Sequence, residues 1–248
     1  MQLRYRSAPR THVGLVRKVN EDAVLARDDA LLWIVADGMG GHDNGQWASQ
    51  TLVAQFAQLD LQMSRSARGA AIVGAIRDGN RAINDAAMAA NKQMGTTAVV
   101  VHCDGDDVLL LWVGDSRIYR LRGTELAQMT RDHTMVQDLV DRGALDPHEA
   151  ETHPMSHVLS RAVGTEPELR YDSVVDKAQA GDRYLLCSDG LTKVVSDPLM
   201  AAILSAGSIE AAADRLIAEA LERGAPDNTT LVVLSAEEAT ALGMRPAL

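Results

Sequence analysis

The hydrophobic and polar positions along the chain predict strands, then two helices, then more strands and two further helices. Residues 31–36 (LLWIVA) are apolar throughout, which is typical of a strand buried on both faces. Apolar side chains recur at helical spacing over residues 45–63 and again over 67–92. The other expected strands are residues 22–29, 96–103, 108–114, 117–122, 125–129, 170–175, 182–187 and 229–235, and the other expected helices lie near 197–205 and 208–223.

This order of elements indicates an α+β fold in which helices cover layers of sheet. Residues 132–165 differ from their surroundings, because they are polar, carry several histidines and contain prolines that interrupt short helical pieces. No internal repeat, low-complexity segment or linker divides the sequence. We therefore expect one domain, residues 1–248, with an excursion at about 132–165.

Charge and composition argue against several classes of protein. The 248 residues include 34 acidic and 24 basic side chains, a net charge of −10, which disfavours binding to nucleic acid or to a membrane surface. A membrane-spanning helix needs about 20 apolar residues, and the longest apolar runs of this chain are far shorter. The first residues lack the apolar stretch of a secretory signal. Cys103 and Cys187 lie in apolar runs, as expected for buried thiols of a cytoplasmic protein.

Acidic residues stand at the ends of predicted buried strands. If the last strand runs antiparallel to its neighbours, its start lies beside their ends, and the carboxylates converge on one rim of the sheets. The acids at these strand ends are Asp37, Asp115, Asp189 and Asp227, while Glu21 and Asp22 open the strand that leads into residues 31–36.

Such a carboxylate cluster needs neutralisation, because like charges repel strongly where water is scarce. Oxygen ligands without a Cys or HExxH set favour Mg²⁺ or Mn²⁺ over Zn²⁺. A single Asp-Gly is more often a turn, and we interpret Asp104-Gly105 as a plain hairpin. The full constellation, however, predicts a site for two divalent ions.

Several short motifs occur in an order that makes the chain resemble a known family. They are Arg17-Lys18-Val19-Asn20-Glu21-Asp22, Val35-Ala36-Asp37-Gly38-Met39-Gly40-Gly41-His42, Gly95-Thr96-Thr97, Val113-Gly114-Asp115-Ser116-Arg117, Thr130-Arg131-Asp132-His133, Ser160-Arg161-Ala162-Val163-Gly164, Cys187-Ser188-Asp189-Gly190-Leu191 and Asp227-Asn228-Thr229-Thr230. Together they resemble the PPM family, the type 2C metal-dependent protein serine/threonine phosphatases, in its compact bacterial form. The resemblance implies a four-layer αββα sandwich, with two central, mostly antiparallel sheets flanked by helix pairs.

The resemblance also implies a metal-ligand set. Asp37 would bridge two Mn²⁺ or Mg²⁺ ions, the Gly38 carbonyl would bind the second ion, and Asp189 and Asp227 would complete the shell of the first. Asp115 would share a third, weaker ion with Asp189. Glu21 and Asp22 would act mainly through metal-bound water, with Glu21 the nearer of the two.

Further residues are expected to act on the substrate. Arg17 matches the phosphate-binding arginine, and a guanidinium fork suits a phosphomonoester. Met39 stands where some members have a histidine, so His42 is the nearest candidate general acid, in competition with water. Ser160 and Arg161 close a flap that would touch protein substrates. The expected reaction is single-step hydrolysis by a water activated between the metal ions.

The histidines of the excursion at 132–165 have no usual zinc spacing, so we expect them to be surface residues. They are His133, His148, His153 and His157.

Two other functions stay open on sequence grounds. One is a pseudophosphatase scaffold that binds a phosphoprotein or a kinase, and the other is a metal phosphohydrolase for small molecules. The leading hypothesis is a phosphatase of phosphoserine and phosphothreonine proteins that opposes a bacterial Hanks-type kinase, with no nucleic-acid or membrane partner, and a monomer by default.

Overall fold

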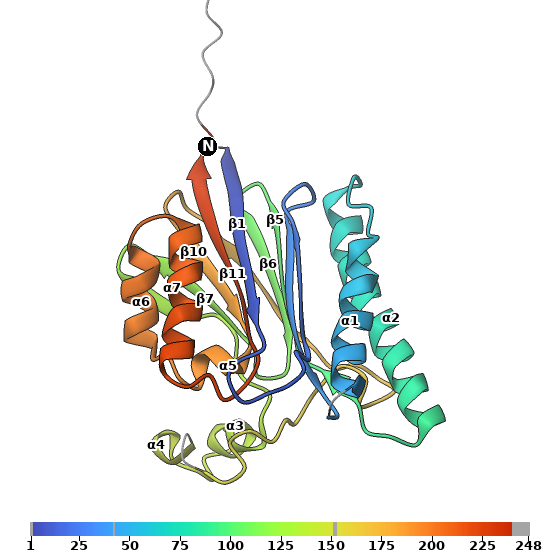
Figure 1. Cartoon of the computed structure of the whole chain (residues 1–248). Helices are drawn as coiled ribbons and strands as arrows, with labels where there is room; N and C mark the ends of the chain where they lie inside the picture. The colour runs from blue at the N-terminus through green and yellow to red at the C-terminus, as the bar shows by residue number, and fades with distance from the viewer. Residues whose placement is uncertain (1, 42, 151–152, 240–248) are drawn as a thin grey trace, which may run out of the picture.

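Two antiparallel sheets form the middle of the molecule, and helices cover the outer face of each (Figure 1). The computed structural model describes residues 2–41, 43–150 and 153–239. The first sheet has the strand order β1 (Leu3–His12), β11 (Thr229–Glu238), β10 (Arg183–Cys187), β7 (Arg117–Arg122) and β8 (Glu125–Gln128). The second has the order β2 (Asp22–Arg27), β3 (Leu32–Met39), β5 (Ala98–Asp104), β6 (Asp107–Val113) and β9 (Asp172–Lys177), and β4 (Gly95–Thr96) pairs with β3.

Helices complete the four layers. The pair α1 (Asp43–Ala57) and α2 (Arg65–Ala90) covers the second sheet, and the pair α6 (Asp197–Ser205) and α7 (Ile209–Glu222) covers the first (Figure 1). The α+β sandwich expected from the sequence is therefore confirmed, and every strand pairing among the described residues is antiparallel.

The alternation of side chains along β3 shows how the layers are joined. Leu32, Ile34 and Ala36 pack into the core between the sheet and α1–α2. Trp33 and Val35 point to the opposite face and pack into the core between the two sheets. Because both faces of β3 are covered, its apolar residues have no contact with solvent.

The strand β1 was not predicted from the sequence. It pairs with β11 over its whole length, from Leu3 opposite Glu238 to His12 opposite Thr229. Only Tyr5 and Ala8 of this strand are buried, and arginines fill much of the rest. The alternating apolar pattern that marks a half-buried strand is therefore too weak to detect.

The helix ends also differ from the prediction. The first helix ends at Ala57 rather than near residue 63, and α2 ends at Ala90 because Asn91 takes a left-handed conformation, with φ of 49°. Asparagine is one of the few residues that adopt this conformation readily at the end of a helix.

The excursion at 132–165 contains two short helices, α3 (Met135–Asp141) and α4 (Pro147–Ala150). It lies beyond the end of the sandwich, near α5 (Asp189–Thr192) (Figure 1). An isolated bridge between Thr134 and Leu159 joins the two sides of the excursion, and a second bridge between Thr96 and Val163 ties its far end to β4.

The expectation of surface histidines is wrong for one member of that segment. His133 is only 4% exposed, and its ring accepts a hydrogen bond from the Gly114 backbone N–H (3.1 Å). It is buried because it anchors the base of the excursion against the end of β6.

Two other expectations concern the thiols and membrane helices. Cys103 and Cys187 are buried with free thiols, as predicted. Within the described part of the chain, no helix combines the length and the apolar composition needed to cross a membrane.

Candidate functional site

The predicted acidic residues meet at one end of the sandwich, where strands of both sheets end. In the second sheet, Asp22 at the start of β2 lies directly opposite Asp37 on β3. In the first sheet, Cys187 pairs with Leu231, so the end of β10 lies beside the start of β11. Asp189 and Asp227 therefore become neighbours, as the antiparallel arrangement predicted.

A cavity of about 420 Å³ opens at this end of the molecule. Asp37, Asp115, Asp189 and Asp227 all line it, together with Glu21 and Gly38. Asp22 does not line the cavity; it is only 7% exposed and lies opposite Asp37 in the sheet. The structure thus brings the whole set of sequence-predicted acidic residues to one place.

The backbone of Asp37 is fixed by threonine hydroxyls. Its N–H donates to Thr97 Oγ1 (2.9 Å), and its carbonyl accepts from the Thr97 N–H (2.8 Å) and from Thr96 Oγ1 (2.9 Å). Thr97 Oγ1 also shares a hydrogen bond with Ser116 Oγ (2.7 Å). The hydroxyl residues next to the acids therefore hold the ends of β3 and β6 in register.

Gly38 is required by the close approach of two backbone segments. A Cβ atom at this position would lie 2.1 Å from the Gly45 carbonyl oxygen and 2.5 Å from that of Glu21. The Gly38 N–H donates to the same Glu21 oxygen (3.1 Å). The absence of a side chain thus lets β3 pass between the Glu21 segment and the start of α1.

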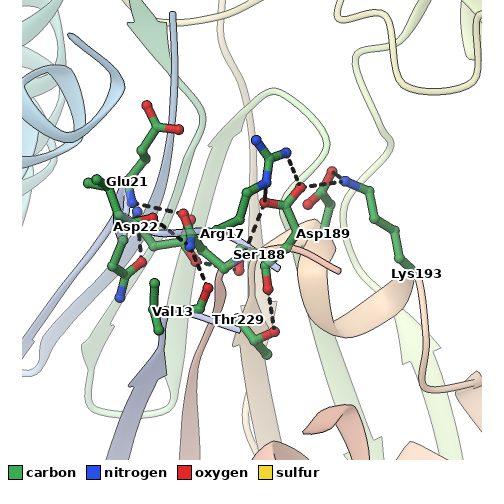
Figure 2. A network of polar contacts seen from close by, with 12 residues as sticks. Val13, Arg17, Glu21, Asp22, Ser188, Asp189, Lys193 and Thr229 are labelled. Carbon is green, nitrogen blue, oxygen red and sulfur yellow. Dashed lines mark hydrogen bonds and ion pairs between the residues drawn. The ribbon is translucent and has the colours of Figure 1, made fainter. Parts of the chain in front are cut away.

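Asn228 ties the segment before β2 to the first sheet. Its side-chain oxygen accepts from the Glu21 N–H (2.8 Å), and its amide donates to the carbonyls of Val13 (2.9 Å) and Val19 (3.0 Å). Figure 2 shows this network at the junction of the two sheets. Arg17 lies on the segment that these bonds pin down.

Asp22 is supported by Ser188, which donates from Oγ to Asp22 Oδ2 (2.8 Å) and accepts from the Thr230 N–H (3.0 Å). Within the described residues, Asp22 Oδ1 and Asp189 Oδ1 are buried and accept no hydrogen bond. Each of these carboxylates therefore has one oxygen open to a ligand, and a buried oxygen without a partner is costly.

Three of the carboxyl groups are strongly perturbed. Burial raises the pKa of Asp37 well above its usual value, and the charges of Asp22, Asp189, Asp115 and Asp227 raise it further. Burial likewise raises the pKa of Asp22 and of Asp115, and the charge of Asp189 adds to both shifts. When ionised, these carboxylates repel one another, and bound cations would relieve that repulsion.

Two basic side chains partly neutralise the cluster. Arg17 forks onto Asp227, with Nε 2.9 Å from Oδ1 and Nη2 3.1 Å from Oδ2. Lys193 Nζ lies 2.6 Å from Asp189 Oδ2 and 3.1 Å from Asp227 Oδ2 (Figure 2). Burial alone would raise the pKa of Asp227, but the charges of Lys193 and Arg17 outweigh it and lower that pKa.

Sequence reasoning missed Lys193. The signal was present, because Lys193 stands four residues after Asp189 and one helical turn places the two side chains together.

The donor atoms suit hard divalent ions. All the acidic side chains at the cavity offer oxygen ligands, and Asp22 Oδ1 and Asp189 Oδ1 are buried without a hydrogen-bond partner among the described residues. Repulsion between the carboxylates also favours the binding of positive charge. Across the ranges 2–41, 43–150 and 153–239, no three His, Cys, Asp or Glu side chains are grouped tightly enough to hold one ion as they stand.

The residues expected to touch substrate lie in different places. Arg17 is at the cavity, and its side chain is half exposed. Arg161 Nη1 lies 3.3 Å from Asp172 Oδ1, next to the contact between His133 and the same carboxylate (3.1 Å). The neighbouring Ser160 donates its backbone N–H to the His133 carbonyl.

The excursion contributes other residues to the cavity, namely His157, Val158 and Leu159. These three were not predicted from the sequence to line the site. His42, the candidate general acid, lies outside the described residues.

Comparisons with known proteins identify the family to which the chain belongs. The family model described as Protein phosphatase 2C matches residues 15–223. The serine/threonine protein phosphatase PstP of Mycobacterium tuberculosis is 44% identical over 233 residues, which are 93% of this chain and 44% of that protein. The chain thus spans less than half the length of this curated relative.

Two solved structures are similar over nearly their whole length. PppA, described as a key regulatory component of T6SS in Pseudomonas aeruginosa, has a TM-score of 0.87 at 39% identity, covering 94% of this chain and 97% of that one. The catalytic domain of PstP in complex with 2 manganese ions has a TM-score of 0.86 at 41% identity, covering 96% of this chain and 100% of that one.

Proposed function

Because the chain belongs to the protein phosphatase 2C family, we propose that it is a metal-dependent phosphatase of phosphoserine and phosphothreonine proteins. One observation carries the proposal: Asp37, Asp115, Asp189 and Asp227, from four separate strand ends, line one cavity with Arg17. Cations must bind to this cluster before a phosphate ester can, because uncompensated carboxylates repel a dianionic ester.

Two divalent ions would be held by Asp37, the Gly38 carbonyl, Asp189 and Asp227, with Glu21 and Asp22 acting through water. Mn²⁺ or Mg²⁺ in this position supplies Lewis-acid charge and activates water for hydrolysis. The PstP structure with 2 manganese ions supports this choice of cofactor.

Arg17 would bind and orient the phosphate of the substrate. Its guanidinium now forks onto Asp227, and the same planar fork matches two oxygens of a phosphomonoester. With cations on Asp227, the attraction between that carboxylate and Arg17 weakens, and the half-exposed side chain is freed to turn to the ester. Metal binding and substrate binding would therefore be coupled through this one side chain.

Asp22 would support the reaction from its place opposite Asp37. Its Oδ1 is buried and accepts no hydrogen bond within the described residues, while Ser188 fixes Oδ2. This leaves one oxygen of Asp22 to orient a water in the site. His42 remains the predicted proton donor to the leaving serine or threonine oxygen.

The excursion at 132–165 would act as a flap of a single phosphatase domain and contact the protein substrate. Its apolar residues Met155 and Val158 are 38% and 47% exposed, and Val158 lines the cavity. Arg161 and Ser160 would shape this flap from its base. We further propose a cytoplasmic enzyme, consistent with the two buried free thiols, that reverses the action of a bacterial serine/threonine kinase.

The test is hydrolysis of a phosphothreonine peptide and of an aryl phosphate by the purified chain. Activity should require added Mn²⁺ or Mg²⁺, and it should be lost in Asp37→Asn and Asp189→Asn but kept in Asp85→Asn, an exposed position on α2. A folded native protein that hydrolyses neither substrate with Mn²⁺ would contradict the proposal.

A further inference from the structure

His133 joins the end of β6 to the excursion at 132–165 through both its backbone and its ring. Its backbone N–H donates to the Gly114 carbonyl (2.9 Å), and its ring Nδ1 accepts from the Gly114 N–H (3.1 Å). The next residue along the chain, Asp115, lines the cavity, and Ser116 after it shares a hydrogen bond with Thr97 (2.7 Å). This strand end is therefore held by the sheet itself, and His133 attaches the excursion to it.

The other side of His133 holds the part of the excursion that lines the cavity. Its carbonyl accepts from the Ser160 N–H (2.9 Å). The residue after it, Thr134, forms a bridge with Leu159, which lines the cavity. His133 thus connects the cavity wall formed by the excursion to the strand end that carries Asp115.

The ring of His133 is fixed in one orientation and one tautomer. It stacks on Trp112, with 6.2 Å between the ring centroids. The closer partner of its Nε2 is Asp172 Oδ2 (3.1 Å) rather than Arg161 Nη1 (3.4 Å), which also contacts Asp172 Oδ1 (3.3 Å). Because a backbone N–H can only donate, Nδ1 carries no proton, and the ring proton is on Nε2. Asp172 therefore favours the tautomer that can accept from Gly114.

We propose that His133 is a positioning residue for protein substrates, which sets the place of the excursion's cavity wall relative to the acidic cluster through its ring contact with Gly114. The inference rests on the proposed function, because it concerns how a phosphoprotein meets that site. A phosphopeptide would contact the wall at Val158 and Leu159, whereas a small aryl phosphate needs only the acidic cluster and Arg17. Displacement of the wall should therefore weaken the binding of the peptide alone.

Two amides that mimic different ring nitrogens test which contact of His133 matters. The oxygen of an asparagine can lie where Nδ1 lies and accept from Gly114, whereas the amide of a glutamine reaches the place of Nε2 and can donate to Asp172. With Mn²⁺, His133→Gln should raise KM for a phosphothreonine peptide about tenfold, with kcat retained, because a displaced wall loses substrate contacts. His133→Asn should stay close to native protein. Both variants should hydrolyse p-nitrophenyl phosphate with native KM and kcat.

The matched control is His102→Gln, which also removes a buried histidine. His102 is 6% exposed, and its Nδ1 lies 3.0 Å from the Leu31 carbonyl oxygen. It pairs with Leu32, at the other end of β3 from Asp37. This variant should leave KM for both substrates unchanged. Circular dichroism establishes that each variant is folded before it is assayed.

Asp172→Asn tests the same contact if His133→Gln does not fold. The oxygen of the asparagine should face Arg161, which leaves its amide facing His133 Nε2. An amide there donates, so the ring proton moves to Nδ1, which can no longer accept from Gly114. We expect KM for the peptide to rise about tenfold again. Nitrogen-15 NMR of the ring should show the proton on Nδ1 in this variant and on Nε2 in native protein.

Three results would overturn the proposal. The first is a native KM for the peptide in folded His133→Gln, and the second is an equal rise in KM for the asparagine and glutamine variants. The third is a parallel loss of peptide and aryl phosphate hydrolysis, because His133 would then support the fold only. If native protein hydrolyses both substrates, these results refute the role of His133 alone. A native protein that hydrolyses neither refutes the proposed function and this inference with it.

Discussion

Replacing Asp22 by asparagine should stabilise the metal-free protein while weakening its response to metal. Burial raises the pKa of Asp22 from 3.8 to about 7, and the charges of Asp189 and Asp227 contribute to the rise. A rise of this size corresponds to about 4 kcal/mol of penalty on the ionised form. An asparagine keeps the hydrogen bond from Ser188 without the charge. Because relaxation absorbs part of the penalty, we expect the free energy of unfolding to increase by about 1–3 kcal/mol.

The gain has a defined pH dependence. Below pH 3.8, Asp22 carries its proton in both the folded and the unfolded protein and costs nothing. As the pH rises toward the folded pKa of about 7, the unfolded chain releases this proton first, and native protein loses stability. The asparagine variant lacks this loss, so its advantage should be larger at pH 8 than at pH 5.

Urea unfolding followed by circular dichroism in EDTA, at pH 5 and pH 8, measures the effect. Asp85→Asn on the exposed face of α2 serves as the control, with a change within about 0.5 kcal/mol. With Mn²⁺ the order should reverse, because native protein gains more from the ions. If Asp22→Asn is no more stable than native protein at pH 8 in EDTA, Asp22 is not the repelled, buried carboxylate described above.

Three further substitutions test other parts of the site. Asp37→Asn should reduce kcat/KM for a phosphopeptide by about a thousandfold or more and remove most of the rise in Tm on adding Mn²⁺. If Mn²⁺ raises the Tm of this variant as much as that of native protein, Asp37 is not a metal ligand. Arg17→Lys keeps the charge but loses the fork, so KM should rise about tenfold with Mn²⁺ affinity retained, while Arg6→Lys on the surface changes neither. Gly38→Ala would place a Cβ 2.1 Å from a backbone oxygen and should lower stability by about 3 kcal/mol or more, whereas Gly74→Ala on α2, with open space around it, should raise it by about 0.5–1 kcal/mol. Urea unfolding compares the two glycine variants, and equal effects would refute the steric argument.

The layered fold was largely predictable because its central strands have unambiguous patterns. Residues 31–36 are apolar without interruption, and the structure buries Leu32 to Ala36 completely between two cores. The strand β1 escaped prediction, because its stability comes from pairing with β11 at the far end of the sequence rather than from its own pattern. The burial of His133 was not predicted for a similar reason, since its hydrogen-bond partners Gly114 and Asp172 lie outside residues 132–165.

The candidate site, too, could be predicted from the sequence only in part. The sequence by itself determined that acids stand where buried strands end, because a strand that leaves a sheet turns its next polar residue toward solvent or a ligand. Only the tertiary structure decided that Asp37 and Asp227 share one cavity and that Arg17 and Lys193 contact the cluster. Hydrophobic periodicity specifies which face of an element is buried. Contacts between charges depend on the antiparallel register of separate strands and on the chain turn that follows each one.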